Sequence, residues 1–463
     1  MTELDFPFSK RYGSDEMRAV WSDDHKRRLW RRIWVALARA QTKAGLVTPE
    51  QAQDLADHAD VLNTARALEI EAEIGHDVMA EVRAFAEQCP VGGGIIHWGA
   101  TSADITDNAD VLRIRDALSL VSARLKTVLA DLSALIETHA ELACMAYTHL
   151  QPAEPTTIGY RLAIYAQDLL EHERVLADLV GALRGKGLKG AVGTQASYGE
   201  MLAGTGVTPR ELEAQVLQAL GLGAYTIATQ TYPRVQDYTV LAALAGLAAS
   251  LHKFAFDLRV LQSAGFGEMA EPFGAKQVGS SAMPFKRNPI NAEKICSLAR
   301  LVAALPHIAW ENAADSLLER TLDDSANRRA AFPEAFLATD EMLRTAHRIL
   351  AGLRVNEEAC AANLARFGPF AATERVLMAA VRAGADRQVM HERLREHSLK
   401  AWAVIHTGQP NPLAGALGGD TQILRYIQPA RLKDLMQAEA YTGTAAERAR
   451  GIATIIRSRL DLG

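Results

Sequence analysis

The segment Gly279–Pro289, with the sequence GSSAMPFKRNP, contains side chains that could bind an anion. It holds two adjacent serines, a Lys-Arg pair and an asparagine, and it lacks the apolar spacing of a helix or a strand. Hydroxyl, ammonium, guanidinium and amide groups all donate hydrogen bonds to carboxylates and phosphates. We therefore interpret this segment as a mobile loop that handles an anionic group, and we expect other segments to complete the site.

Three further polar segments lie between apolar stretches: HWGATSADITDN at 97–108, THLQPAEPTT at 148–157 and ERTLDDSANRR at 319–329. Each also has a purely structural interpretation. The first could contain a capping box at Thr101–Asp104, the second could begin a helix at its prolines, and the third could be a solvated face of paired charges. Together, their hydroxyl, imidazole and guanidinium groups favour one site for a substrate with carboxylates and a phosphate.

The sequence lacks the motifs of several other kinds of site. It has no GxxxxGK[ST] phosphate loop, no strand followed by GxGxxG, and no HExxH or carboxylate cage. The net charge of −5 is spread along the chain, so there is no basic surface of the kind that nucleic acids require. We expect side chains alone to perform the chemistry, without a metal or a cofactor.

Composition and cysteine usage indicate an ordinary intracellular protein. Apolar residues make up 49% of the 463 residues and charged residues 23%. The N-terminus lacks a signal-peptide pattern, and the longest apolar stretch, around Val240 to Leu251, is too short to span a bilayer. We expect a soluble, cytoplasmic, membrane-free protein. Four widely spaced cysteines in apolar contexts are expected to be reduced core residues: Cys89, Cys144, Cys296 and Cys360.

Helical periodicity runs through most of the chain. Apolar residues recur in alternating steps of three and four at positions 111, 114, 118, 121, 125, 128, 132 and 135, which predicts a long helix with a coiled-coil-like seam. Similar patterns cover 158–180, 238–261 and 293–318, the last interrupted by Pro306, and loops are expected near 89–99, 151–155, 184–194 and 271–289. The pattern predicts an all-α fold built on a bundle of long helices. Its uncovered apolar seams favour self-association.

Several segments resemble the adenylosuccinate lyase family, in its animal-type branch, within the fumarase/aspartase superfamily. They are RYGSDEM, GHDVMAEV, IIHWGATSADITDN, THLQPAEPTT, GLKGAVGTQAS, TQTYPR, KQVGSSAMPFKRNPINAEK and ERTLDDSANRR. The resemblance implies an N-terminal helical domain at 1–102, a central long-helix bundle at 103–355 and a C-terminal helical domain at 356–463. It also implies a homotetramer with a central helical core and with each active site assembled from three subunits.

The same resemblance implies a cofactor-free carbon-nitrogen lyase of purine biosynthesis. Such an enzyme releases fumarate from adenylosuccinate, giving AMP, and from SAICAR, giving AICAR. By resemblance, Ser280 is the catalytic base, His149 is the acid, Glu293 orients that imidazole, and Lys286 stabilises the developing charge. The implied substrate contacts are Arg11, Tyr12, His76, Asp77, Thr101, Ser102, Thr148, Gln230, Ser281, Met283, Asn288, Arg320, Ser325 and Arg329.

Three positions near these motifs are His97, Gly75 and Lys294. His97 precedes the GATS turn and is assigned a structural role. Gly75 and Lys294 stand where animal-type members carry an arginine, which could change affinity or the balance between the two substrates.

Two alternatives remain open from the sequence. One is another lyase of the superfamily that acts on a different succinyl or amino-acid compound, although the cluster of phosphate-type arginines disfavours it. The other is a non-catalytic helical assembly, which would not need Ser280, His149 and Lys286.

Overall fold

The computed structural model describes residues 6–274 and 276–461, and most of them are helical. The chain forms two compact units, neither of which is one continuous segment. The first comprises Met1–Arg124, His172–Ala249 and Ser297–Arg344, and the second comprises Leu125–Glu171, Ser250–Cys296 and Thr345–Gly463. The prediction of an all-α fold with a long-helix bundle is confirmed, and the division into three consecutive domains stays a prediction.

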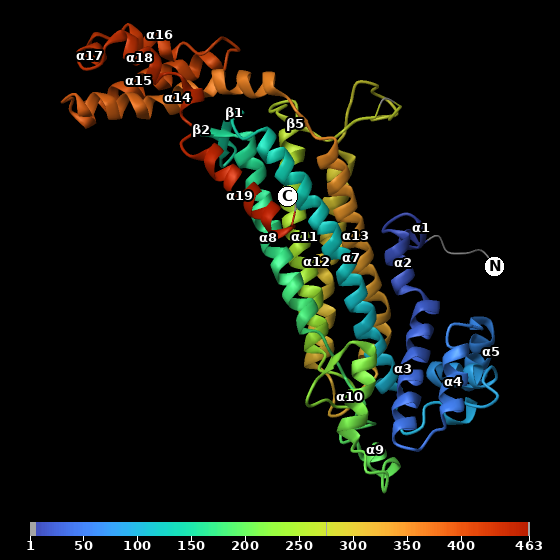
Figure 1. The fold of residues 1–463 in the computed structure, drawn as a ribbon. Helices are drawn as coiled ribbons and strands as arrows, with labels where there is room; N and C mark the ends of the chain where they lie inside the picture. The colour runs from blue at the N-terminus through green and yellow to red at the C-terminus, as the bar shows by residue number, and fades with distance from the viewer. Residues whose placement is uncertain (1–5, 275, 462–463) are drawn as a thin grey trace. The chain divides into compact units, whose positions relative to one another are not determined.

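Long helices contribute residues to both units, and in each unit their segments lie side by side (Figure 1). They are α7 (Ser102–Thr138), α8 (Ile158–Ala182), α11 (Val235–Leu261), α12 (Ile290–Ala314) and α13 (Asp323–Ala351). The apolar seam predicted for α7 is buried from Val111 to Leu132, but Ile136 replaces Leu135 at its end. An α-helix has 3.6 residues per turn, so a strict repeat of 3.5 drifts off the buried face.

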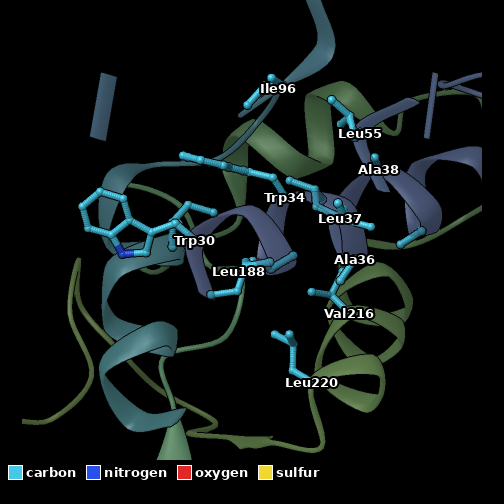
Figure 2. Packing of buried hydrophobic residues seen from close by; sticks show 14 of the residues in the cluster. Trp30, Trp34, Ala36, Leu37, Ala38, Leu55, Ile96, Leu188, Val216 and Leu220 are labelled. Atoms are coloured by element: carbon cyan, nitrogen blue, oxygen red, sulfur yellow. The ribbon is translucent and has the colours of Figure 1, made fainter. Parts of the chain in front are cut away.

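Shorter elements complete the first unit. They are α1 (Pro7–Lys10), α2 (Asp15–Trp21), α3 (Asp23–Lys43), α4 (Pro49–His58), α5 (Thr64–Ile74), α6 (Asp77–Ala86), η1 (Gly93–Ile95), β3 (Arg184–Gly185), α9 (Ala196–Met201), α10 (Pro209–Leu220) and β4 (Gly223–Ala224). Figure 2 shows part of their core, where Trp30, Trp34 and Leu37 of α3 pack with Leu55 of α4 and Val216 of α10. The buried aromatic face of α3 fixes the elements around it.

The second unit adds a hairpin and a set of C-terminal helices. Its elements are β1 (Ala143–Thr148), β2 (Gln151–Thr157), β5 (Met269–Ala270), β6 (Arg354–Val355), α14 (Glu357–Arg382), α15 (Arg387–Ile405), α16 (Leu413–Gly418), α17 (Thr421–Leu424), α18 (Pro429–Leu435), η2 (Ala438–Ala440) and α19 (Ala445–Arg459). The antiparallel pair β1–β2 corrects the expectation of a loop or helix start near 151–155. Pro152 and Pro155 lie in β2, opposite Tyr147 and Met145. Proline is tolerated there because a two-stranded sheet consists only of edge strands.

Two other expectations about long segments were wrong. Pro306 lies inside α12 and does not end it, because a proline removes one helical hydrogen bond while the rest of the helix can continue as a kinked element. The stretch around Val240 to Leu251 was expected to be too short to span a bilayer, but it lies in α11, which is long and apolar enough to do so by length and composition. In the most apolar part of α11, 44% of the residues are buried. One helix of this kind is weak evidence for a membrane span, since core helices pass the same test.

The four cysteines are free and buried, as expected.

Candidate active site

One cavity in the first unit, of about 820 Å³, brings together many of the predicted substrate contacts. The predicted residues that line it are His76, Asp77, Thr101, Ser102, Gln230, Arg320, Ser325 and Arg329. They come from the beginnings of α6, α7 and α13 and from the loop before α11. Helix N-termini present unpaired N–H groups and favour negative charge. The helix N-termini at this cavity therefore favour the binding of an anion.

His76 and Asp77 begin α6, and the turn before them fixes their direction. Gly75 ends α5 with φ of +67°, a left-handed conformation that glycine adopts without strain. The His76 imidazole then caps α6, because its Nδ1 accepts a hydrogen bond from the Met79 backbone N–H at 3.3 Å. That bond requires the other ring nitrogen, Nε2, to carry the proton when the ring is neutral.

Buried ion pairs anchor α6 to α3. The carboxylate of Glu81 accepts hydrogen bonds from Arg27 at 2.7 Å and from Arg31 at 2.6 Å, and all three residues are buried. Removing one partner of such a pair leaves an uncompensated buried charge. This triad therefore holds the helix that begins with His76 and Asp77.

Asp104 organises the turn that presents Thr101 and Ser102. It accepts hydrogen bonds from the Thr101 backbone N–H at 3.0 Å, the Lys186 ammonium at 2.5 Å and the Tyr198 hydroxyl at 3.0 Å. Burial lowers the pKa of Lys186, and the charge of Asp104 opposes this. The capping role foreseen for Asp104 is present, and it belongs to a buried network next to the implied substrate contacts Thr101 and Ser102.

A second charged network, missed in the sequence, lies beside the arginines of the cavity. Arg234 donates two hydrogen bonds to Asp107, at 3.1 and 3.2 Å, and one to Asp324 at 2.6 Å. Asp324 also accepts from Arg320 at 2.7 Å. Burial opposes the ionisation of Asp324, but Arg234 and Arg320 hold its pKa below the usual range. This network connects the starts of α7, α11 and α13, and so fixes Arg320.

Aromatic side chains form another wall of the cavity. Trp21, Trp30 and Phe332 line it, and the Arg113 guanidinium lies 4.6 Å from the centroid of the Trp21 ring. The indole N–H groups of Trp21 and Trp30 are buried and have no hydrogen-bond partner within the described chain. In the sequence, these residues have the helical spacing of ordinary core positions, so they were not predicted to belong to a site.

Arg11 and Tyr12 also belong to the first unit, but they are not among the described residues that line this cavity. Arg18 donates to the backbone carbonyl of Tyr12 at 2.9 Å, and Asp340 accepts from the Ser14 N–H at 2.7 Å. These contacts fix the backbone of the segment and leave the Arg11 side chain exposed.

The predicted acid lies in the second unit, at the tip of the β1–β2 hairpin. His149 and Leu150 form the two-residue turn between paired residues Thr148 and Gln151, with φ values of 52° and 58°. A type I′ turn needs positive φ at both central positions, which normally selects Asn-Gly. A left-handed conformation costs a residue with a Cβ about 1–2 kcal/mol, and such strain often marks functional positions.

The loop 279–289 also belongs to the second unit, and its own backbone closes it. The Ser280 Oγ accepts hydrogen bonds from the N–H groups of Ala282 and Met283, at 3.3 and 3.1 Å. Asn288 donates to the Gly279 carbonyl at 2.9 Å. A Cβ at Gly279 would lie 2.0 Å from the Lys286 carbonyl oxygen, so this approach requires glycine. Lys286, Ser281 and the predicted contact Met283 are exposed.

Glu271, which the sequence did not single out, anchors the end of this loop. Its carboxylate accepts hydrogen bonds from the backbone N–H groups of Asn291 and Ala292, at 3.1 and 3.0 Å, in the first turn of α12. Burial raises the pKa of Glu271, while these N–H groups oppose the shift. The predicted orienting residue, Glu293, follows in the same turn, and its N–H donates to the Pro289 carbonyl at 2.9 Å.

Comparisons with known proteins show the family of the chain. A family model described as Lyase matches residues 10–303, and one described as Adenylosuccinate lyase C-terminus matches residues 369–450. The chain is similar to a solved fumarate lyase from Mesorhizobium sp. BNC1, with a TM-score of 0.84 and 25% identity over 98% of this chain and 100% of that one. It is also similar to a 3-carboxy-cis,cis-muconate lactonizing enzyme from Pseudomonas putida, with a TM-score of 0.86 and 25% identity over 98% and 99% of the two chains.

The fold and these matches define a lyase of the fumarase/aspartase superfamily. Among curated proteins, the chain is 38% identical to the adenylosuccinate lyase of Saccharomyces cerevisiae, over 95% of this chain and 92% of that one. It is 41% identical to that of Schistosoma mansoni, over 89% and 87% of the two chains. The chain belongs to the adenylosuccinate lyase family, which confirms the resemblance seen in its motifs.

Proposed function

We propose that this protein releases fumarate from adenylosuccinate, giving AMP, and from SAICAR, giving AICAR, as a step of purine nucleotide biosynthesis. The observation that carries the proposal is the cavity of the first unit, in a chain of this family. It combines Arg320, Ser325 and Arg329, which suit a phosphate, with Thr101 and Ser102, which suit carboxylates. The aromatic wall suits a purine ring.

The reaction is a β-elimination. A base removes a proton from a carbon next to a carboxylate, a C=C bond forms, and the electron pair of the C–N bond moves to the nitrogen on the purine side. Ser280 takes the proton, and His149, oriented by Glu293, gives a proton to the leaving nitrogen. Lys286 and Asn288 stabilise the extra negative charge beside the carboxylate, an effect of about 3 kcal/mol for one well-placed donor.

An isolated serine hydroxyl is too weak an acid to be ionised near neutral pH, so Ser280 must be activated. Two features of the loop support such activation. The N–H groups of Ala282 and Met283 point at Oγ, and hydrogen bonds to an anionic form stabilise it. Lys286 adds positive charge from the same loop.

We further propose a soluble, cytoplasmic homotetramer that shares its active sites between subunits and uses no cofactor. In one chain, the cavity residues belong to the first unit, whereas His149, Ser280 and Lys286 belong to the second. Three subunits could bring one cavity, one hairpin and one loop into a single site. Light scattering should therefore give a tetramer mass at working concentration.

The test is fumarate release by the purified protein, with EDTA present and with adenylosuccinate and SAICAR supplied separately. We expect each substrate to yield one fumarate for each molecule of its other product, AMP or AICAR. Turnover of a different succinyl compound, with neither of these accepted, would identify another lyase of the superfamily. A folded tetramer that is inactive on every such compound would favour a non-catalytic assembly.

A further inference from the structure

A second cavity, in the second unit, is lined by three arginines and by no acidic side chain among the described residues. It has a volume of about 610 Å³, which is in the range of small-molecule sites. Arg375 and Arg382 come from α14, and Arg431 comes from α18, which contacts α14 (Figure 1). None of its lining residues belongs to the candidate active site.

The position of Arg375 is fixed by the backbone around it. Its Nη1 donates to the carbonyl oxygens of Leu435 and Gln437, at 2.9 and 2.8 Å, and its guanidinium lies 5.5 Å from the centroid of the Tyr441 ring. Its Nε and Nη2 groups have no hydrogen-bond partner in the part of the chain that the structure describes. The guanidinium is therefore held in place with donors still available, as preorganised binding requires.

Arg382 and Arg431 are exposed, and neither has an ion pair or a side-chain hydrogen bond within residues 6–274 and 276–461. Other arginines of the same unit are paired, such as Arg393 with Asp420 at 2.7 Å. Arg382 lies in the last turn of α14, where a cation is favoured, so one arginine alone would need no ligand. Three guanidinium groups around one cavity with no carboxylate among its lining residues repel one another, and an anion would offset that repulsion. The carboxylate of Glu374, which accepts a hydrogen bond from Tyr441 at 3.1 Å, lies outside this lining.

The rest of the cavity is aromatic and apolar. Tyr426 and Tyr441 line it with Met378, Ile427 and Leu435, and Met378 is 45% exposed although it is apolar. Aromatic and apolar side chains bind flat rings, and arginine binds phosphate groups with two hydrogen bonds at once. The cavity thus offers separate contacts for a ring and for several phosphate oxygens.

We propose that this cavity binds a nucleotide with two or three phosphates, at a site separate from the catalytic cavity. Three guanidinium groups match a polyphosphate better than a single phosphate. The inference does not depend on the reaction proposed above, because the two cavities share no residue.

The test uses ATP as the probe in equilibrium dialysis with the full-length protein. We compare the wild type with the double variant Arg382→Gln/Arg431→Gln. Both side chains are exposed, so their replacement should not unfold the protein. Loss of charge-assisted hydrogen bonds should weaken ATP binding by about tenfold or more. Arg425→Gln is the matched control, since Arg425 is an exposed arginine of the same segment that does not line the cavity.

Several outcomes would overturn the proposal. The first is ATP binding that Arg329→Gln abolishes and the double variant leaves unchanged, which would place the ATP in the catalytic cavity. A second is inorganic pyrophosphate binding as tightly as ATP, which would show that the ring is not recognised. The third is a change of mass in light scattering for the double variant, which would assign these arginines to an interface between copies. Support requires weakened ATP binding with mass, circular dichroism and fumarate release unchanged.

Discussion

Arg329 and Asp77 form an ion pair in the candidate active site, with Arg329 Nη2 donating to Asp77 Oδ2 at 2.8 Å. Both residues were implied substrate contacts, and Arg329 suits a phosphate. The Arg329 side chain is 63% exposed, and exposed pairs contribute only about 0–1 kcal/mol. A phosphate can therefore displace Asp77 from Arg329 at little cost.

Arg329→Gln should raise KM for adenylosuccinate about tenfold to a hundredfold, because a charge-assisted contact to phosphate contributes about 1.5–3 kcal/mol. The effect on kcat should be small if this contact is equal in the ground and transition states. Steady-state kinetics test this, with Arg83→Gln as the control, because Arg83 is exposed on α6 and does not line the cavity. Equal KM values for wild type and Arg329→Gln would remove Arg329 from the site.

Gly75→Ala and Gly75→Arg separate the backbone role of this position from its side chain. No atom lies within 4 Å of an added Cβ, so the cost that both changes share is the strain of φ +67°, about 1–2 kcal/mol. Both variants should therefore melt at similarly lowered temperatures. Because Gly75 lines the cavity, only the arginine should change KM, by about threefold to tenfold. Identical KM values for the two variants would show that the missing arginine has no bearing on affinity.

Leu150→Gly should stabilise the hairpin that carries His149. Glycine adopts the positive φ of this turn without strain, although it also gains freedom in the unfolded chain. Leu150→Ala is the control, because it removes the same exposed side chain but keeps the Cβ. The hairpin of the glycine variant should be more stable than that of the alanine variant by about 0.5–1 kcal/mol. This difference should appear as about two- to fivefold slower amide hydrogen exchange in β1 and β2. Faster exchange in the glycine variant would show that the turn is not strained.

Glu154→Gln should stabilise the second unit at neutral pH and have less effect in acid. Partial burial, and then the neighbouring carboxylate of Glu374, raise the pKa of Glu154, although its side chain still reaches solvent. A carboxyl group whose folded pKa is raised destabilises the fold once it ionises. The cost therefore appears as pH rises through the ordinary glutamate range and is complete above the raised pKa.

Melting temperatures at pH 4 and pH 7 test this prediction for Glu154. The increase in melting temperature caused by Glu154→Gln should be larger at pH 7 than at pH 4. It should shrink in high salt, because both carboxylates are exposed. Glu439→Gln is the control, because Glu439 is another exposed glutamate of the second unit. A gain that is the same at both pH values would exclude repulsion from Glu374.

The long helices could be predicted from the sequence because their burial repeats at helical spacing, as in the seam from Val111 to Leu132. The β1–β2 hairpin could not. It has prolines in one strand, and His149-Leu150 stands where a turn of this type usually has Asn-Gly. Its pairing depends on contacts such as Arg161 Nη2 donating to the Met145 carbonyl at 2.6 Å, which no local pattern reports.

The candidate site, too, could be predicted from the sequence only in part. Polar motifs identified His76, Thr101, Arg320 and others, and the structure brings these together in one cavity. The network of Asp107, Arg234 and Asp324 was missed because its members are far apart in the chain and each alone is an ordinary charged residue. Only the fold shows that they are buried and paired.

In the proposed tetramer, one active site combines His149 and Ser280 from different subunits around the cavity of the first unit. The most direct measurement mixes His149→Ala with Ser280→Ala, exchanges subunits under mild denaturant, and records fumarate release from adenylosuccinate. Each variant alone should be almost inactive, and the mixture should recover activity because some mixed sites contain both intact residues. If hybrid tetramers form by mass and the mixture stays as inactive as its parents, the shared-site account is contradicted.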